Sequence, residues 1–191
     1  MNWWTALCLA AAAVLLWQQI VCRRRIHALK KQLKEALANA SAGQQRDPLT
    51  GLESRASLEQ RLQEICGDGI VAVLDLDDFR RLNELLGHLG GDEVLRAIGR
   101  FVLASIREKD RAFRWGGDEF VLLFSDVEPE VARIRMSQIE QRLRHFQIRH
   151  YGEVSIGVSW GIARTAGRPL RESLDEADRA MYASKRNRLH N

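Results

Sequence analysis

Adjacent carboxylates at Asp118 and Glu119 directly follow two glycines, in the run Arg-Trp-Gly-Gly-Asp-Glu-Phe at 114–120. Further upstream, an apolar run ends in acidic residues that begin at Asp75. Carboxylates that two strands bring together can hold a hard cation such as Mg²⁺. These residue types and their spacing therefore predict a divalent-metal site. A Gly-Gly-Asp-Glu run on its own could equally be a solvated turn, so the prediction depends on the rest of the chain.

The two glycines suit a tight hairpin turn, because glycine adopts positive φ values at little cost. Gly116 and Gly117 would let a strand over 111–115 fold back onto a strand over 119–124. A turn without side chains also leaves room for a nucleotide to approach the main chain. The pair therefore predicts a hairpin whose tip can face a nucleotide.

Helix and strand patterns alternate along the chain, which is typical of an α/β domain. Apolar periodicity and turn residues predict a helix that begins at 128–130 and further helices over 54–66, 79–87, 91–107 and 169–187. The same signals predict strands over 70–76, 111–115, 119–124 and 153–163. We therefore expect an α/β fold with a single central mixed, mostly antiparallel sheet flanked by helices.

Two of these helices carry apolar side chains at the spacing of a core-facing stripe. In the helix that begins at 128–130, the predicted inward residues are Ile134, Ile139, Leu143 and Phe146. In the last helix they are Leu174, Ala177, Met181 and Tyr182. Both stripes predict that these helices pack against the sheet.

The length of 191 residues suits one compact domain with an appendage. A domain of roughly 140 residues buries a sizeable core without disulfides or metals. The net charge of +4 is mild, and the chain has no basic motif interleaved with aromatic residues, so we expect no nucleic-acid partner. The three cysteines have no metal-ligand spacing, which fits a reducing compartment for the globular part.

The N-terminal residues 3–22 are nearly all apolar, and a helix of about 20 residues spans about 30 Å, enough to cross a hydrocarbon core. Arginines at 23–25 follow at once, and no lysine or arginine precedes the run. The apolar run predicts one transmembrane helix over 1–22 in the inner (cytoplasmic) membrane. The positive-inside rule then puts residues 23–191 in the cytoplasm. A cleavable signal peptide, which would carry its charge before the apolar run, and a buried core helix are the alternatives.

The basic segment 23–46 carries an apolar seam at alternating spacings of three and four: Ile26, Leu29, Leu33, Ala36 and Ala40. This heptad pattern predicts a short coiled-coil stalk that pairs two copies of the chain. An amphipathic helix lying on lipid is the alternative. A break at Asp47-Pro48 ends the stalk, so the globular domain is predicted over 47–191.

Five separated blocks of the chain resemble the GGDEF family of diguanylate cyclases. They are Asp-Pro-Leu-Thr-Gly-Leu at 47–52, the acidic run at 75–84 with Gly87-His88 and Gly91-Asp92, the run at 114–120, Ser-Trp-Gly-Ile-Ala at 159–163, and 177–185. The resemblance covers about residues 47–187. The family condenses two GTP molecules into cyclic di-GMP and releases two pyrophosphates. Because one domain holds one GTP, the resemblance implies a homodimer with two domains face to face.

The resemblance also implies which residues hold the metal. Asp75, the Leu76 carbonyl, Asp118 and Glu119 match the positions that bind Mg²⁺, with Mn²⁺ as an alternative. Glu119 matches the acid that binds metal or helps to deprotonate the attacking 3′-hydroxyl. A strand-end cap is the structural alternative for Asp75.

For the nucleotide, the resemblance implies that Asn83 and Asp92 read guanine, because an amide and a carboxylate complement its polar edge. Arg80 and Lys185 match phosphate contacts, and Gly116 and Gly117 leave space for the nucleotide. His88 could face a phosphate or be a structural histidine. A turn residue or a helix N-cap is the alternative for Asn83 and Asp92.

A regulatory motif of the family is an Arg-x-x-Asp that ends five residues before the two glycines. Arg107 and Asp110 meet this spacing, which implies a product-inhibition site for cyclic di-GMP. A guanidinium can grip a guanine edge or a phosphate, and a carboxylate a guanine edge. An ordinary i,i+3 ion pair is the alternative.

One departure from the family lies at the C-terminus, where Leu189 replaces an arginine. Arg188 could supply the missing phosphate contact from the neighbouring position. The three acids Asp75, Asp118 and Glu119 are all present, which favours an active cyclase. The alternative is a catalytically silent domain that binds GTP or cyclic di-GMP as a signalling module.

Overall fold

The computed structural model describes residues 45–64 and 66–189, together with Trp4, Trp17, Gln19, Arg23 and Arg25. The chain divides into two compact units, 1–43 and 44–191. Within the described ranges, none of the helices has the length and apolar character that a membrane crossing needs. Most of the predicted transmembrane helix over 1–22 and most of the predicted stalk over 23–46 lie outside the described residues, so both stay predictions.

Within the described residues, the central sheet has four strands in the order β2-β3-β1-β6. They are β1 (Gly69–Leu76), β2 (Arg111–Arg114), β3 (Glu119–Ser125) and β6 (Val158–Arg164). All three strand pairings are antiparallel. Parallel pairing occurs, among the described residues, only at an isolated bridge between Glu53 and Phe113. The predicted α/β fold is therefore confirmed, whereas the described strands of the central sheet are paired antiparallel and not mixed.

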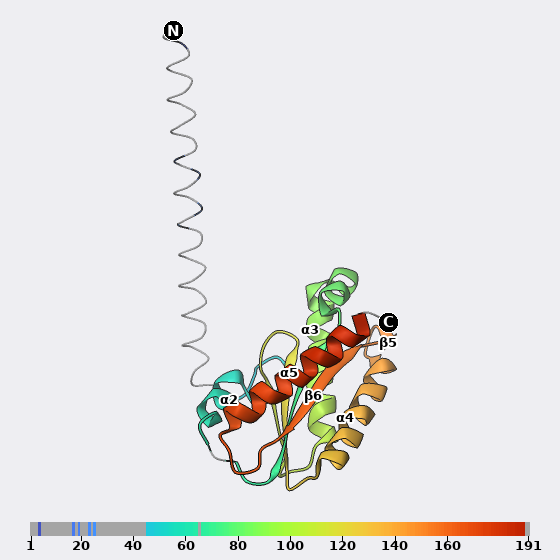
Figure 1. Cartoon of the computed structure of the whole chain (residues 1–191). Coiled ribbons are helices and arrows are strands. Elements are labelled where there is room, and N and C mark those ends of the chain that lie inside the picture. The colour runs from blue at the N-terminus through green and yellow to red at the C-terminus, as the bar shows by residue number, and fades with distance from the viewer. Residues whose placement is uncertain are drawn as a thin grey trace. The chain divides into compact units, whose positions relative to one another are not determined.

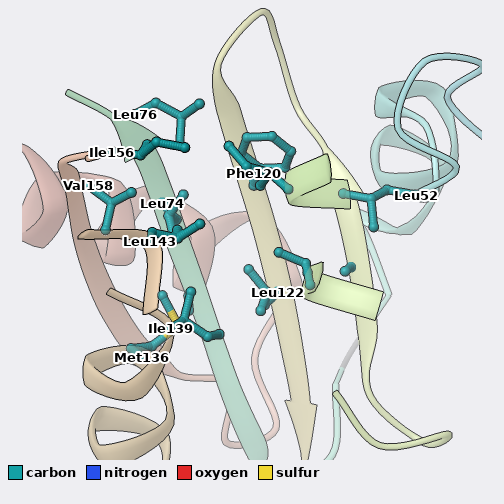
Figure 2. Packing of buried hydrophobic residues seen from close by; sticks show 14 of the residues in the cluster. Leu52, Leu74, Leu76, Phe120, Leu122, Met136, Ile139, Leu143, Ile156 and Val158 are labelled. Atoms are coloured by element: carbon teal, nitrogen blue, oxygen red, sulfur yellow. The ribbon is translucent and has the colours of Figure 1, made fainter. Parts of the chain in front are cut away.

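Helices cover both faces of this sheet (Figure 1). They are α2 (Arg55–Arg61), α3 (Phe79–Ser105), α4 (Pro129–Arg144) and α5 (Leu170–Leu189). Every residue of β1 is buried, and its side chains alternate between two cores. Leu74 faces the core formed with α3 and α4, whereas Val73 faces the core formed with α2 and α5. Figure 2 shows the first core, with Met136, Ile139 and Leu143 of α4 packed near Leu74.

The predicted strand over 153–163 is wrong in one respect, because it is two strands. β5 (Gly152–Val154) pairs with β4 (Phe146–Ile148) in a separate hairpin, and β6 begins only at Val158. The break holds Gly157, whose carbonyl accepts a hydrogen bond from the Asp77 N–H at 2.8 Å. β4 was not predicted, since a strand of three residues carries almost no periodic signal.

Two residues predicted to face the core are exposed. Ile134 is 57% exposed and Tyr182 is 60% exposed. The buried seam of α4 runs through Ala132, Met136, Ile139 and Leu143, and that of α5 through Leu170, Leu174, Ala177 and Met181. At about 100° per residue, a position two after Ala132 lies on the opposite side of the helix, and one directly after Met181 lies well off the seam.

Candidate active site

The acidic residues of the site come from the adjacent ends of β1 and β3. Asp75 and Glu119 are direct partners in the β1–β3 ladder, and the Leu76 N–H donates to the Asp118 carbonyl at 3.2 Å. The Asp75 side chain is largely buried, and the Lys185 ammonium of α5 donates to its Oδ1. The structure therefore brings together Asp75, Leu76, Asp118, Glu119 and Lys185, which the sequence analysis singled out.

The loop between β2 and β3 is held by main-chain hydrogen bonds at its base. The Trp115 N–H donates to the Glu119 carbonyl at 2.9 Å. Strands β2 and β3 pair as predicted, but neither Gly116 nor Gly117 has a positive φ, so that part of the prediction is wrong. What Gly116 provides is space, because a Cβ there would lie 3.1 Å from Glu119 Oε2. The Gly117 position is open, with nothing within 4 Å of an added Cβ.

The charged side chains at this strand end change one another's pKa values. Burial raises the pKa of Asp75, and the charges of Asp118 and Asp77 add to this, while Lys185 opposes it. Burial also raises the pKa of Glu119, as do the charges of Asp75 and Asp118. For Lys185, burial lowers the pKa, but the hydrogen bond and charge of Asp75 outweigh it and the net pKa is raised. The site therefore attracts cations.

These residues fit a hard divalent cation in the chemistry of their donors, which are carboxylate and carbonyl oxygens. Asp75 already binds a cationic group, the Lys185 ammonium, in this structure. Across the described residues, no three carboxylate, imidazole or thiol side chains are placed as a ready-made metal centre.

A second group of predicted site residues lies at the bend in α3. Gly87 has φ 72° and ψ 166°, a conformation that disfavours residues with a Cβ, and it separates the two predicted helices. Across this bend the Asn83 amide lies against Gly91, where a Cβ would be 1.8 Å from its Oδ1. Asp92 follows directly and is half-exposed, with Arg96 at 3.9 Å. The bend thus places the Asn83 amide close to the chain segment that carries the half-exposed carboxylate of Asp92.

Two other predicted nucleotide contacts, Arg80 and His88, are exposed. The Arg80 side chain is 92% exposed, and its Nε donates to Glu84 Oε1 at 3.2 Å on its own helix. His88 lies exposed just after the bend at Gly87. Neither residue is held against the carboxylates of the site, so a nucleotide would have to recruit them.

Arg107 and Asp110 have different environments. The Asp110 carboxylate is fully buried and accepts from the N–H groups of Arg107 and Ser125 and from Arg135 Nη1, each at 3.1 Å. It therefore binds the main chain of Arg107 rather than its guanidinium. Arg107 lines a surface pocket of about 600 Å³, and Arg46 and Arg111 line it too.

One functional connection was missed by the sequence analysis. Arg114 donates to the Gly117 carbonyl at 2.7 Å through Nη2 and to Asp47 Oδ1 at 3.2 Å through Nη1. Asp47 also accepts from the Thr50 N–H and hydroxyl at 2.8 and 2.7 Å. Burial raises the pKa of Asp47, but the Thr50 hydrogen bonds and the charge of Arg114 outweigh it and hold the pKa below its usual value. Asp47 thus orients Arg114, which lies 67 residues away in the chain and binds the loop between β2 and β3.

The antiparallel sheet and its acidic strand ends define an α/β domain with a cation-attracting centre. The protein-family profile described as "Diguanylate cyclase, GGDEF domain" matches residues 44–191. The chain therefore belongs to the GGDEF family.

Known relatives agree with this assignment. Diguanylate cyclase DgcP from Pseudomonas aeruginosa is 39% identical over 149 residues, which cover 73% of this chain and 22% of that protein. The GGDEF domain of DgcB from Caulobacter crescentus, solved in complex with c-di-GMP, superposes with a TM-score of 0.69 at 29% identity, covering 75% of this chain and 91% of that one. A DgcB structure that includes its coiled coil, also with c-di-GMP, gives 0.69 at 28%, covering 84% and 90%.

Proposed function

We propose that this chain is a diguanylate cyclase, which condenses two GTP molecules into cyclic di-GMP and releases two pyrophosphates. The observation that carries the proposal is the pairing of Asp75 with Glu119 at the ends of β1 and β3, beside Lys185. Family membership and a relative named as a diguanylate cyclase support it. Because the chain spans 22% of that relative, the activity is proposed for this chain and not transferred from it.

Asp75, the Leu76 carbonyl, Asp118 and Glu119 would hold Mg²⁺, or Mn²⁺ in its place. When bound, the metal neutralises triphosphate charge and the charge that develops during phosphoryl transfer. In each half of the reaction, the 3′-oxygen of one GTP bonds to the α-phosphorus of the other, and the bond to pyrophosphate breaks. Glu119 would accept the hydroxyl proton.

The bend in α3 supplies the guanine-binding residues. The Asp92 carboxylate can accept from the N1–H and N2 amino groups of guanine, and the Asn83 amide can meet the purine edge. Adenine presents an acceptor at N1, so Asp92 selects against it. Lys185 and Arg80 would contact phosphates, with His88 at the edge of the same site. Gly116 and Gly117 leave the main chain of the loop open to the nucleotide.

Two copies of the domain would have to meet, since each holds one GTP. The predicted coiled-coil stalk over 23–46 would pair two chains, and the coiled coil of the DgcB structure supports this. The predicted transmembrane helix over 1–22 would anchor the homodimer in the inner membrane with the domain in the cytoplasm. Tethering two domains in this way raises their local concentration without new contacts between them.

We also propose that cyclic di-GMP inhibits the enzyme through the pocket at Arg107. Its guanidinium is free to bind a guanine edge or a phosphate, while the buried Asp110 holds the main chain of the motif. The GGDEF domain of DgcB, solved in complex with c-di-GMP, supports a binding site for the product on this fold.

The test is product formation by the full-length chain in detergent with GTP and Mg²⁺, followed by chromatography and mass measurement. Cyclic di-GMP that is lost in Glu119→Gln and kept in Glu172→Gln, an exposed acid on α5, would support the cyclase. Bound GTP and confirmed dimers without product would instead favour the silent signalling module.

A further inference from the structure

The last turn of α5 carries two cations on one side of the helix. Lys185 and Arg188 are three residues apart, the spacing at which helical side chains are neighbours. They reach two acids at the end of β1: Lys185 donates to Asp75, and Arg188 Nη1 lies 3.6 Å from Asp77 Oδ2. This turn of helix is therefore bound at the strand end that carries the acidic site.

Arg188 is also bound to two further elements. Its Nη1 donates to the carbonyl of Val158, which pairs with Leu76 in the β1–β6 ladder. Its Nη2 donates to Glu140 Oε1 of α4 at 2.8 Å. The Arg188 guanidinium thus binds the end of α5 to both β6 and α4. Arg188 and Glu140 are 48 residues apart in the chain.

Glu140 is well suited to receive this arginine. Its side chain is 14% exposed, its Oε2 accepts from the Trp160 indole N–H at 2.8 Å, and Arg144 donates to Oε1 at 2.8 Å. Burial raises the pKa of Glu140, but the hydrogen bonds from Arg144 and Trp160 and the charge of Arg188 outweigh it and keep the pKa below its usual value. Glu140 is therefore a fixed anion that holds Arg188 in one orientation.

This arrangement changes the interpretation of Arg188. From the sequence alone, Arg188 could supply the phosphate contact of the family arginine whose position Leu189 occupies. In the structure both terminal nitrogens are engaged by protein oxygens. A guanidinium bound to a carboxylate and a carbonyl would have to give up those bonds to meet a phosphate.

We propose that Arg188 is a positioning residue: anchored by Glu140 and Val158, it fixes the last turn of α5 so that Lys185 stays at the Asp75 end of the site. The proposal rests on the proposed function, because Lys185 is its expected phosphate contact. It gives the chain a substitute for the missing arginine that works through helix placement and not through contact with the nucleotide.

The kinetic test compares Arg188→Gln, Lys185→Gln and the double variant in the full-length protein, with GTP and Mg²⁺. We expect Arg188→Gln to raise KM for GTP about fivefold with kcat within about twofold, and to add nothing in the Lys185→Gln background. Arg186 is an exposed arginine on the same turn, so Arg186→Gln should leave both constants unchanged. Arg188→Lys should raise KM less than Arg188→Gln does. Effects of Arg188→Gln and Lys185→Gln that simply multiply would overturn the proposal.

Hydrogen exchange separates this proposal from the proposed function. Loss of either Arg188 or Glu140, as Gln variants, should speed amide exchange in the last turn of α5, while Arg186→Gln should not. If the wild type makes no cyclic di-GMP, the proposed function fails, and exchange still tests the anchoring of Lys185. Exchange rates that stay at the wild-type value in Arg188→Gln would overturn the anchoring itself.

Discussion

Replacing Asp110 by asparagine is expected to destabilise the domain by about 3–5 kcal/mol, the range for breaking a buried ion pair from one side. The side chain is 0% exposed and accepts three hydrogen bonds, two from main-chain N–H groups and one from Arg135. Asparagine keeps the shape but offers one acceptor oxygen and no charge. The Arg135 guanidinium, itself 16% exposed, would then be a nearly buried cation without a counter-ion.

This loss of free energy is a large fraction of the stability of a typical domain, which is about 5–15 kcal/mol. For a domain of about 150 residues, each kcal/mol lowers Tm by about 2–4 °C. The Asp110→Asn variant should therefore unfold about 6–20 °C below the wild type. Arg135 also stacks over Phe124, at 5.5 Å from the ring centre, and this contact should weaken once the guanidinium loses its carboxylate.

The measurement is thermal unfolding of the full-length chain in detergent, followed by tryptophan fluorescence. Asp126→Asn is the matched control, because Asp126 is 74% exposed and pairs with Lys109 at 2.9 Å. Asparagine also tolerates the φ of 49° at this position. An exposed pair contributes about 0–1 kcal/mol, so the control should change little. An Asp110→Asn variant that melts within about 2 °C of the wild type would refute the role assigned to this carboxylate.

Three further predictions concern neighbouring features of the same domain. The pKa of Asp47 is lowered in the folded protein, so its charge stabilises the fold fully above about pH 5 and less as the pH falls below about 3.9. In thermal melts over pH 7 to 3, the difference in Tm between the wild type and Asp47→Asn should therefore become smaller at the acid end. Gly91→Ala places a Cβ 1.8 Å from Asn83 Oδ1 and should raise KM for GTP up to about tenfold, while Gly67→Ala, with open space around it, should not. Gly161→Ala would put a Cβ 2.2 Å from the main chain of α5 and should cost about 1–3 kcal/mol, read as a lower Tm.

The parts of the site that depend on main-chain position could be predicted from the sequence. Asp75 lies near the end of one apolar strand and Glu119 begins another, so an antiparallel pairing of these two strands brings both acids to the same end of the sheet. The bend at Gly87 likewise follows from a glycine at the end of an apolar helix pattern. In both cases the signal is local, and the geometry follows once the strands pair or the helix turns.

The wrong predictions concern features that a local sequence pattern does not decide. Tyr182 is apolar enough to join the stripe of α5, yet the seam through Met181 leaves it 60% exposed. Gly116 and Gly117 suggested a turn with positive φ, but the loop is held by Arg114 and needs the space of Gly116 beside Glu119. Propensity predicts that a turn exists, whereas its conformation is set by the side chains that bind it.

Long arginine side chains carry the part of the site that no motif spacing predicts. Arg114 binds Asp47 67 residues away, and Arg188 binds Glu140 48 residues away, although several acids are nearer in the sequence. A guanidinium has five donors and a flexible stem, so its partner is decided only after the helices have packed. Arg188 meets Glu140 because α4 lies against β6, where Trp160 and the Val158 carbonyl hold the two groups together. The resemblance to the family offers Arg188 only as a phosphate contact next to Leu189, whereas the tertiary packing binds its guanidinium to Glu140 and the Val158 carbonyl.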